Sequence, residues 1–176
     1  MPSHQGREIE LVRRAAEGDQ EAFAALVARF QRPVVSFAFR YLGNREDAED
    51  AAQDAFVRVY FSLAKLQDPT KFASYLFTTA LNACRTRASR KQPTIPDAEI
   101  EGEGPQAEVV ARAERQRIAQ AISRLPMEYR LPVTLRVHDG LSFAEIGEVI
   151  GATESACRVR YHRAKEMLRA VLGEGT

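Results

Sequence analysis

The chain has 176 residues, of which 45% are hydrophobic and 28% charged, and its formal net charge is only +1. These values describe an ordinary globular protein of one medium or two small domains, and they argue against a protein that coats nucleic acid without specificity. The first ten residues, MPSHQGREIE, are polar, and the sequence contains no stretch of about 18 apolar residues. We therefore expect a cytoplasmic protein with no membrane insertion.

The side-chain composition predicts an all-α fold without a bound cofactor or metal. Ala, Leu, Arg and Glu are abundant, and these residues favour helices over strands. Cys84 and Cys157 lie far apart and form no Cys-x-x-Cys pair, so neither a disulfide framework nor a zinc site is indicated. A reducing cytoplasm fits this pattern.

Helical periodicity predicts four helices in the first half of the chain. The first covers residues 7–17, and Asp19 can cap the second. Asn44 can cap the third helix, and Asp68 with Pro69 can start the fourth, which runs to about residue 90. Two helices carry apolar stripes at three- and four-residue spacing, which indicates a shared core. The stripes consist of Phe23, Leu26, Val27, Phe30, Val34, Phe37 and Tyr41, and of Ala48, Ala52, Phe56, Val59 and Leu63.

The composition changes at residues 93–106, PTIPDAEIEGEGPQ. This segment has three prolines, two glycines and four acidic residues. Its few apolar side chains cannot bury enough surface to offset the conformational entropy that would be lost on folding. It is predicted to be a flexible acidic linker, which reaches about 46 Å when fully extended. The sequence therefore predicts two small helical domains, residues 1–92 and 107–176.

The second domain contains the pattern of a helix-turn-helix. Ser142 and Glu145 are spaced as a capping box, which marks the start of a helix. Gly151 can end that helix in a left-handed conformation, and Thr153 can cap the next one after a very short turn. Two helices joined in this way form the motif that places its second helix in the major groove of DNA.

Helical phase divides the second helix of this motif into two faces. The predicted inward face consists of Cys157, Tyr161, Ala164 and Leu168. The opposite face presents Arg158, Val159 and His162 toward base edges, and Arg158 could contact guanine through two hydrogen bonds. The residues placed to reach phosphates are Arg160, Arg163 and Lys165.

Charge is clustered despite the small net value. One basic cluster comprises Arg85, Arg87, Arg90 and Lys91, and a second comprises Arg158, Arg160, Arg163, Lys165 and Arg169. Two such clusters in a neutral chain indicate two separate contacts with a polyanion. Residues 45–54 are rich in Asp and Glu, so one surface is expected to prefer a basic partner.

Longer sequence phrases resemble a known family. Residues 125–168, with LPxxYRLP, LR, GLSxxEI and YHRAK, resemble region 4 of extracytoplasmic-function (ECF) sigma factors, which reads the promoter's minus-35 element. Upstream, GDQEAFAALVARF, DAEDAAQDAFVRVY and FASYLFTTALNAC resemble region 2 in the correct order. The resemblance implies a non-enzymatic RNA polymerase sigma factor whose partners are core RNA polymerase, promoter DNA and an anti-sigma factor.

The resemblance also implies three sets of site residues. The polymerase-binding set is Asp50, Gln53, Asp54 and Phe56. The minus-10 set is Lys71, Phe72, Tyr75, Asn82 and Arg85, in which Phe72 and Tyr75 mainly support the pocket for an extruded base. The minus-35 set is Ser155, Arg158, Val159, Arg160, His162, Arg163 and Lys165.

The sequence departs from the family pattern at both DNA-reading surfaces. Tyr75 stands where the family usually has Trp, and Thr78 stands where a basic residue is common. Ser155-Ala156-Cys157 replaces a frequent Gly-Thr-Val, and Val159 replaces a small polar residue. Base preference at the minus-35 element is therefore expected to differ from that of typical members.

Three alternatives are open at this stage. A two-domain repressor or activator could bind DNA without polymerase, although duplex DNA would repel the acidic residues 45–54. An enzyme could use Asp47, Asp50 and Asp54 as a magnesium site, but the sequence has no phosphate-cradling Gly-rich loop and its histidines form no visible dyad. A helical adaptor without a nucleic-acid role would leave both basic clusters unexplained.

Overall fold

The protein is described from a computed structural model that covers residues 4–90 and 106–173, with side chains for residues 6–90 and 111–173. Every regular element within these ranges is helical, which confirms the all-α prediction. The first half consists of α1 (His4–Ala16), α2 (Gln20–Leu42), α3 (Arg45–Ser62), two short 3-10 turns (Leu63–Lys65 and Pro69–Lys71) and α4 (Phe72–Ala88). The second half consists of α5 (Gln106–Ser123), α6 (Met127–Val137), α7 (Phe143–Ile150) and α8 (Glu154–Gly173).

The helix boundaries of the first half follow the predicted caps. The Asp19 carboxylate accepts a hydrogen bond from the Ala22 amide at 3.0 Å, and the Asn44 side chain accepts one from the Asp47 amide at 3.0 Å. Gly43, with φ +72°, ends α2 in the left-handed conformation that glycine adopts without strain. Between these caps α2 continues unbroken through Pro33.

The start of α4 differs from the prediction. Asp68 accepts hydrogen bonds from the Thr70 amide at 2.9 Å and the Thr70 hydroxyl at 2.6 Å, so it caps a 3-10 turn. An aspartate readily forms such local bonds two residues ahead, and here they close a short turn instead of an α-helix. The α-helix therefore begins three residues later than Pro69, at Phe72, and it ends at Ala88.

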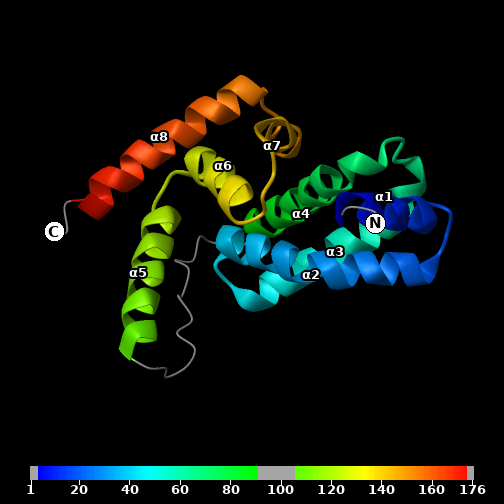
Figure 1. The fold of residues 1–176 in the computed structure, drawn as a ribbon, viewed down its shortest axis with the longest axis horizontal. Coiled ribbons are helices and arrows are strands. Elements are labelled where there is room, and N and C mark those ends of the chain that lie inside the picture. Colours follow the sequence, from blue (N-terminus) through cyan, green and yellow to red (C-terminus); the bar gives the residue numbers. More distant parts are fainter. Residues whose placement is uncertain (1–3, 91–105, 174–176) are drawn as a thin grey trace.

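The two halves pack against each other through α4 and α7 (Figure 1). One continuous cluster of fully buried side chains includes Val34, Phe37 and Phe77 from the first half and Leu135 and Ile146 from the second. The predicted linker lies outside the described residues except Gln106, the first residue of α5. The domains predicted from sequence thus share a core in this structure, in which α4 of the first half packs against α7 of the second.

Within the described residues, one helix is long and apolar enough to cross a membrane by length and composition, namely α2. The core helix of a soluble protein passes the same test. Here α2 packs against α1, α3 and α4, and its Leu26, Val34 and Phe37 are almost completely buried. Helix packing therefore accounts for the most apolar of its inward-facing residues.

Candidate functional site

The helix-turn-helix is formed by α7, a three-residue turn and α8. The Ser142 hydroxyl accepts from the Glu145 amide at 3.2 Å, and the Glu145 carboxylate accepts from the Ser142 amide at 2.7 Å. The predicted capping box is therefore confirmed. Gly151 adopts φ +72° at the end of α7, and Thr153 accepts from the Ala156 amide at 3.1 Å to cap α8.

Gly147 brings the two helices of this motif close together. A Cβ atom at this position would lie 2.6 Å from the carbonyl oxygen of Ala152, which belongs to the turn. The Ala152 amide donates to the Gly147 carbonyl at 2.9 Å, so the backbone at the turn is in direct contact with α7. Any larger residue at Gly147 would therefore displace the turn and the α8 helix that follows it.

The rotation of α8 agrees with the predicted faces. Cys157 and Ala164 are completely buried, and Tyr161 and Leu168 are partly buried against the same side. The exposed members of the predicted minus-35 set are Ser155, Arg158, Val159, His162 and Arg163. Arg160 and Lys165 are half-buried, and the Lys165 ammonium lies 5.7 Å from the centre of the Tyr161 ring.

The predicted minus-10 residues of α4 differ widely in exposure. Asn82 and Arg85 are exposed, whereas Lys71 and Tyr75 are half-buried. Phe72 is completely buried, and its ring packs edge-on against Phe30 with centroids 5.3 Å apart. The Phe72 ring is enclosed by its own helical bundle, which is consistent with the supporting role that the resemblance implies for it.

The amino-terminal end of α4 is also covered by the helix-turn-helix. Glu148 of α7 forms an ion pair with Lys71, with Nζ and Oε1 2.5 Å apart. The same carboxylate accepts from the Ser74 hydroxyl at 2.8 Å. The predicted minus-10 lysine is thus engaged by the domain predicted to read the minus-35 element.

The predicted polymerase-binding residues lie in two places, since Asp50 and Asp54 face α4 whereas Gln53 and Phe56 lie between α2 and α3. Asp54 is 2.7 Å from the Arg87 guanidinium of α4, and Asp50 is 3.7 Å from the same group. Both carboxylates remain about half exposed, at 57% for Asp50 and 47% for Asp54. Part of the acidic charge of α3 is therefore already paired within the chain, which the sequence analysis did not predict.

This pairing also bears on the magnesium alternative. Asp50 and Asp54, two of its three carboxylates, face an arginine rather than an open cation site. In the part of the chain that the structure describes, no group of three or more His, Cys, Asp or Glu side chains is arranged to hold a metal ion. The arrangement favours an interaction surface over a metal centre.

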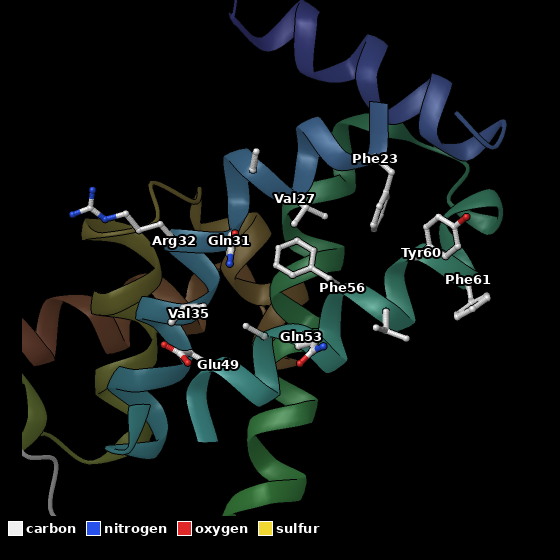
Figure 2. Close-up of a pocket in the computed structure, with 13 residues that line it drawn as sticks. Phe23, Val27, Gln31, Arg32, Val35, Glu49, Gln53, Phe56, Tyr60 and Phe61 are labelled. Carbon is white, nitrogen blue, oxygen red and sulfur yellow. The ribbon is translucent and has the colours of Figure 1, made fainter. Parts of the chain in front are cut away.

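The other two predicted polymerase-binding residues, Gln53 and Phe56, line a groove of about 730 Å³ between α2 and α3. Figure 2 shows Phe56 in the middle of this groove, with Phe23, Tyr60 and Phe61 toward one end. Polar side chains lie toward the other end, namely Gln31, Arg32 and Glu49. The groove is therefore lined by aromatic side chains in its middle and at one end, and by polar side chains toward its other end.

Sequence reasoning missed most of the residues of this groove. Phe61, Val57 and Tyr60 are 78%, 49% and 43% exposed, which is unusual for large apolar side chains gathered in one place. Phe23, predicted to be a core residue, packs edge-on against Tyr60 with centroids 5.0 Å apart. The available signal was the presence of apolar residues on α3 outside its inward stripe.

A second contact between the halves is a buried ion pair. Both carboxylate oxygens of Asp139, in the turn between α6 and α7, lie 3.5 Å from Nη2 of Arg40 in α2. The Asp139 side chain is only 2% exposed, and the Arg40 Nε is buried without a hydrogen-bond partner. Burial raises the pKa of the Asp139 carboxyl to about 7, although Arg40 acts in the opposite direction.

This pKa makes the stability of the packed form depend on pH. An aspartate has a pKa near 4 when unfolded, so unfolding of the wild type is favoured increasingly as pH rises from about 4 to about 7, and no further above that. Asp139→Asn should remove this effect and stabilise the chain above pH 7 by at most about 4 kcal/mol. The measurement is thermal unfolding of both proteins from pH 5 to pH 8.

The neighbouring His138 acts in the opposite direction. Partial desolvation and the Arg40 charge lower the pKa of its imidazole, so it destabilises the packed form as pH falls below about 6.5. Because both proteins carry His138, its contribution cancels in the difference between them. A stability difference that stays constant across the pH range would contradict the role assigned to Asp139.

Comparison with known proteins identifies the family. The family model of Sigma-70 region 2 matches residues 26–94, and that of Sigma-70 region 4 matches residues 115–168. The ECF RNA polymerase sigma factor SigW of Bacillus subtilis (strain 168) is 34% identical over 92% of this chain and 94% of the relative. This chain belongs to the ECF sigma factors.

Further relatives support the same assignment. The ECF RNA polymerase sigma-E factor of Escherichia coli (strain K12) is 31% identical over 90% of each chain. The solved structure of CnrH in complex with the cytosolic domain of CnrY has a TM-score of 0.75 and 27% identity, and covers 97% of this sigma factor and 99% of CnrH. The sigma factor RpoE of Bartonella quintana, in complex with the anti-sigma factor NepR, shares the fold with a TM-score of 0.70 at 15% identity over 88% and 98% of the two chains.

The protein is accordingly an RNA polymerase sigma factor that directs promoter-specific transcription initiation. Sigma factors are initiation factors rather than enzymes, and they act on RNA polymerase in the cytoplasm. The alternative of a regulator that binds DNA without polymerase is not favoured, because both sigma regions are present in order.

Proposed function

We propose that residues 1–92 bind core RNA polymerase and the minus-10 element, and that residues 107–176 read the minus-35 element, with residues 93–106 as the linker. The observation that carries this division is the exposed basic face of α8 in a fully formed helix-turn-helix, together with exposed Asn82 and Arg85 on α4. The sigma factor needs no cofactor and no catalytic group for this role, and its place of action is the cytoplasm.

The minus-35 contacts are assigned to the amino-terminal half of α8. Arg158, Val159 and His162 are exposed where a recognition helix meets base edges. Ser155 and Arg163 are exposed at its margins, and half-buried Arg160 and Lys165 have long side chains that can extend to phosphates. Sequence specificity is assigned to Arg158, Val159 and His162, and general affinity for DNA is assigned to the residues at the margins and near the phosphates.

The minus-10 contacts are assigned to Lys71, Tyr75, Asn82 and Arg85. Tyr75 is half-buried and its hydroxyl donates to Ser62 at 2.5 Å, so its ring is held in one orientation. A fixed ring can stack on an extruded base and offset the loss of base stacking. Phe72 supports this surface from within the core.

Core RNA polymerase is assigned to the face of α3 that carries Asp50, Gln53, Asp54 and Phe56, continuing into the α2–α3 groove. The acidic pair supplies charge for a basic partner, and the groove supplies apolar area. An anti-sigma factor is proposed as a further partner, since the sigma factor RpoE of Bartonella quintana, which shares this fold, is described in complex with the anti-sigma factor NepR.

The decisive experiment mixes the purified chain with core RNA polymerase and genomic DNA fragments and sequences the transcript starts. The expected result is a small set of starts that share two upstream elements and are absent without the chain. Transcripts that do not depend on the chain, or tight specific DNA binding by the chain alone at physiological salt, would favour the regulator alternative.

The polymerase-binding face can be tested by exchanging the two partners of one ion pair. The double variant Asp54→Arg with Arg87→Asp leaves the net charge unchanged and keeps opposite charges at positions 54 and 87, while the Asp50 carboxylate then faces a second carboxylate at position 87. It replaces one acidic side chain of α3 by a basic one and so lowers the negative charge of this helix, and affinity for core polymerase is expected to fall about tenfold or more. The measurement is binding of labelled protein to core enzyme without DNA.

The matched control for this exchange is Arg87→Lys, which keeps the charge at every position. It should bind core polymerase like the wild type, and thermal unfolding should show both variants to be folded. If the exchanged pair binds core enzyme with wild-type affinity, the acidic face of α3 is not part of the contact.

A further inference from the structure

Phe143, which no sequence motif assigned to DNA recognition, lies beside the first turns of α8. It is the first residue of α7 and directly follows the helix cap Ser142. The centre of its ring is 5.2 Å from the Arg158 guanidinium carbon and 5.0 Å from that of Arg136. Two cations that belong to different helices are therefore gathered on one half-buried aromatic ring.

The position of this ring is fixed from several sides. Phe143 packs against the continuous hydrophobic core, and the ring of Tyr161 meets it edge-on with centroids 5.3 Å apart. The capping box at Ser142 and Glu145 holds the backbone at the same point. A ring with so little freedom can orient a flexible side chain that lies on it.

Arg158 is the flexible side chain whose orientation this ring can restrict. It is 54% exposed, and its other contact is Glu154, which accepts from Nη2 at 2.5 Å one turn earlier in α8. Reading a guanine requires two N–H groups of the guanidinium in one plane with the base. Holding that plane before binding reduces the rotamer entropy lost on complex formation.

We propose that Phe143 is a positioning residue for minus-35 recognition, which orients the Arg158 guanidinium for a base contact by stacking beneath it. This inference rests on the proposed function, in which Arg158 reads a base. Phe143 itself touches no base, so its effect is confined to the base pair that Arg158 reads.

The test uses the complete chain with core polymerase and a promoter library randomised over the minus-35 element, all other promoter sequence being held constant. Phe143→Leu keeps an apolar side chain at the core but removes the aromatic face. Its transcripts should show about two- to fivefold weaker discrimination at one base pair, with the other positions unchanged. Phe143→Tyr keeps the ring and should retain wild-type discrimination.

Two controls separate positioning from a structural role. Arg136→Met removes the other cation on the same ring and should leave discrimination at that base pair unchanged. Arg158→Ala should abolish discrimination there, and adding Phe143→Leu to Arg158→Ala should have no further effect on it. Thermal unfolding of each variant shows whether α7 and α8 remain packed.

The outcomes are distinct. If Phe143→Leu weakens base discrimination equally at all positions of the minus-35 element, the positioning role is overturned. It is also overturned if Phe143→Leu weakens discrimination as much in the Arg158→Ala background as in the wild type. If Arg158→Ala leaves discrimination intact, the base contact and the positioning role both fail while sigma activity stands. If the wild-type chain directs no transcription with core polymerase, the proposed function itself fails.

Discussion

Arg158→Ala is expected to cost about 1 to 3 kcal/mol on the preferred minus-35 sequence and to relax discrimination at one base pair, since a bidentate base contact carries sequence information. The structure supports this choice of residue, because Arg158 is exposed in the first turns of α8, whereas Cys157 and Ala164 are buried. The measurement is transcription from promoters that differ by single base pairs.

Arg163→Ala is the matched variant on the same helix. Arg163 is also exposed, but it lies farther along α8, where it is assigned to a phosphate. Its loss should weaken all promoter variants alike and reduce the dependence of binding on salt by about one unit of the logarithmic slope. If Arg158→Ala instead lowers every promoter equally, α8 is docked in another rotation, with Val159 and His162 facing the bases.

Local features could be predicted from sequence because they depend on neighbouring residues. The caps at Asp19 and Asn44 and the capping box at Ser142 and Glu145 each join residues three positions apart. The inward face of α8 follows from helical periodicity alone. Asp68 shows the limit of this reasoning, since a local rule predicted its capping role but could not distinguish a 3-10 turn from an α-helix.

Contacts between distant segments could not be predicted in this way. Nothing in the acidic run of α3 shows that Asp50 and Asp54 meet Arg87, which comes from another helix 33 residues after Asp54. The ring of Phe143 meets Arg158 across the tight turn between α7 and α8, which the absence of a side chain at Gly147 permits. These arrangements depend on helix packing, which single-sequence patterns do not encode.

The packing of the two halves has a direct consequence for promoter recognition. Elements named minus-10 and minus-35 lie about 25 base pairs apart, which is about 85 Å along a duplex. In the packed form, Lys71 of the minus-10 surface lies 2.5 Å from Glu148, in the helix before the recognition helix. With the contacts proposed above, the two surfaces cannot occupy both elements in this arrangement, so we expect the halves to separate when the protein acts at a promoter.

Covalent closure of this contact should therefore abolish sigma activity. A carbodiimide activates a carboxylate for attack by an adjacent amine, and the Lys71 Nζ and Glu148 Oε1 are close enough to form an amide without a spacer. The cross-linked chain, verified by mass spectrometry of the joined peptides, is expected to lose nearly all transcription with core polymerase. Untreated protein from the same preparation should remain fully active.

Two variants distinguish the effect of joining the two halves from the effect of losing the Lys71 side chain. Lys71→Arg keeps the charge but cannot be joined to Glu148 by this reagent, so its treated form should retain the activity of its untreated form. Lys71→Gln removes the charge without a cross-link, and it measures what Lys71 contributes to promoter binding. A cross-linked chain as active as Lys71→Gln would show that the packed form already reads the promoter, because only the lost charge would then have affected transcription.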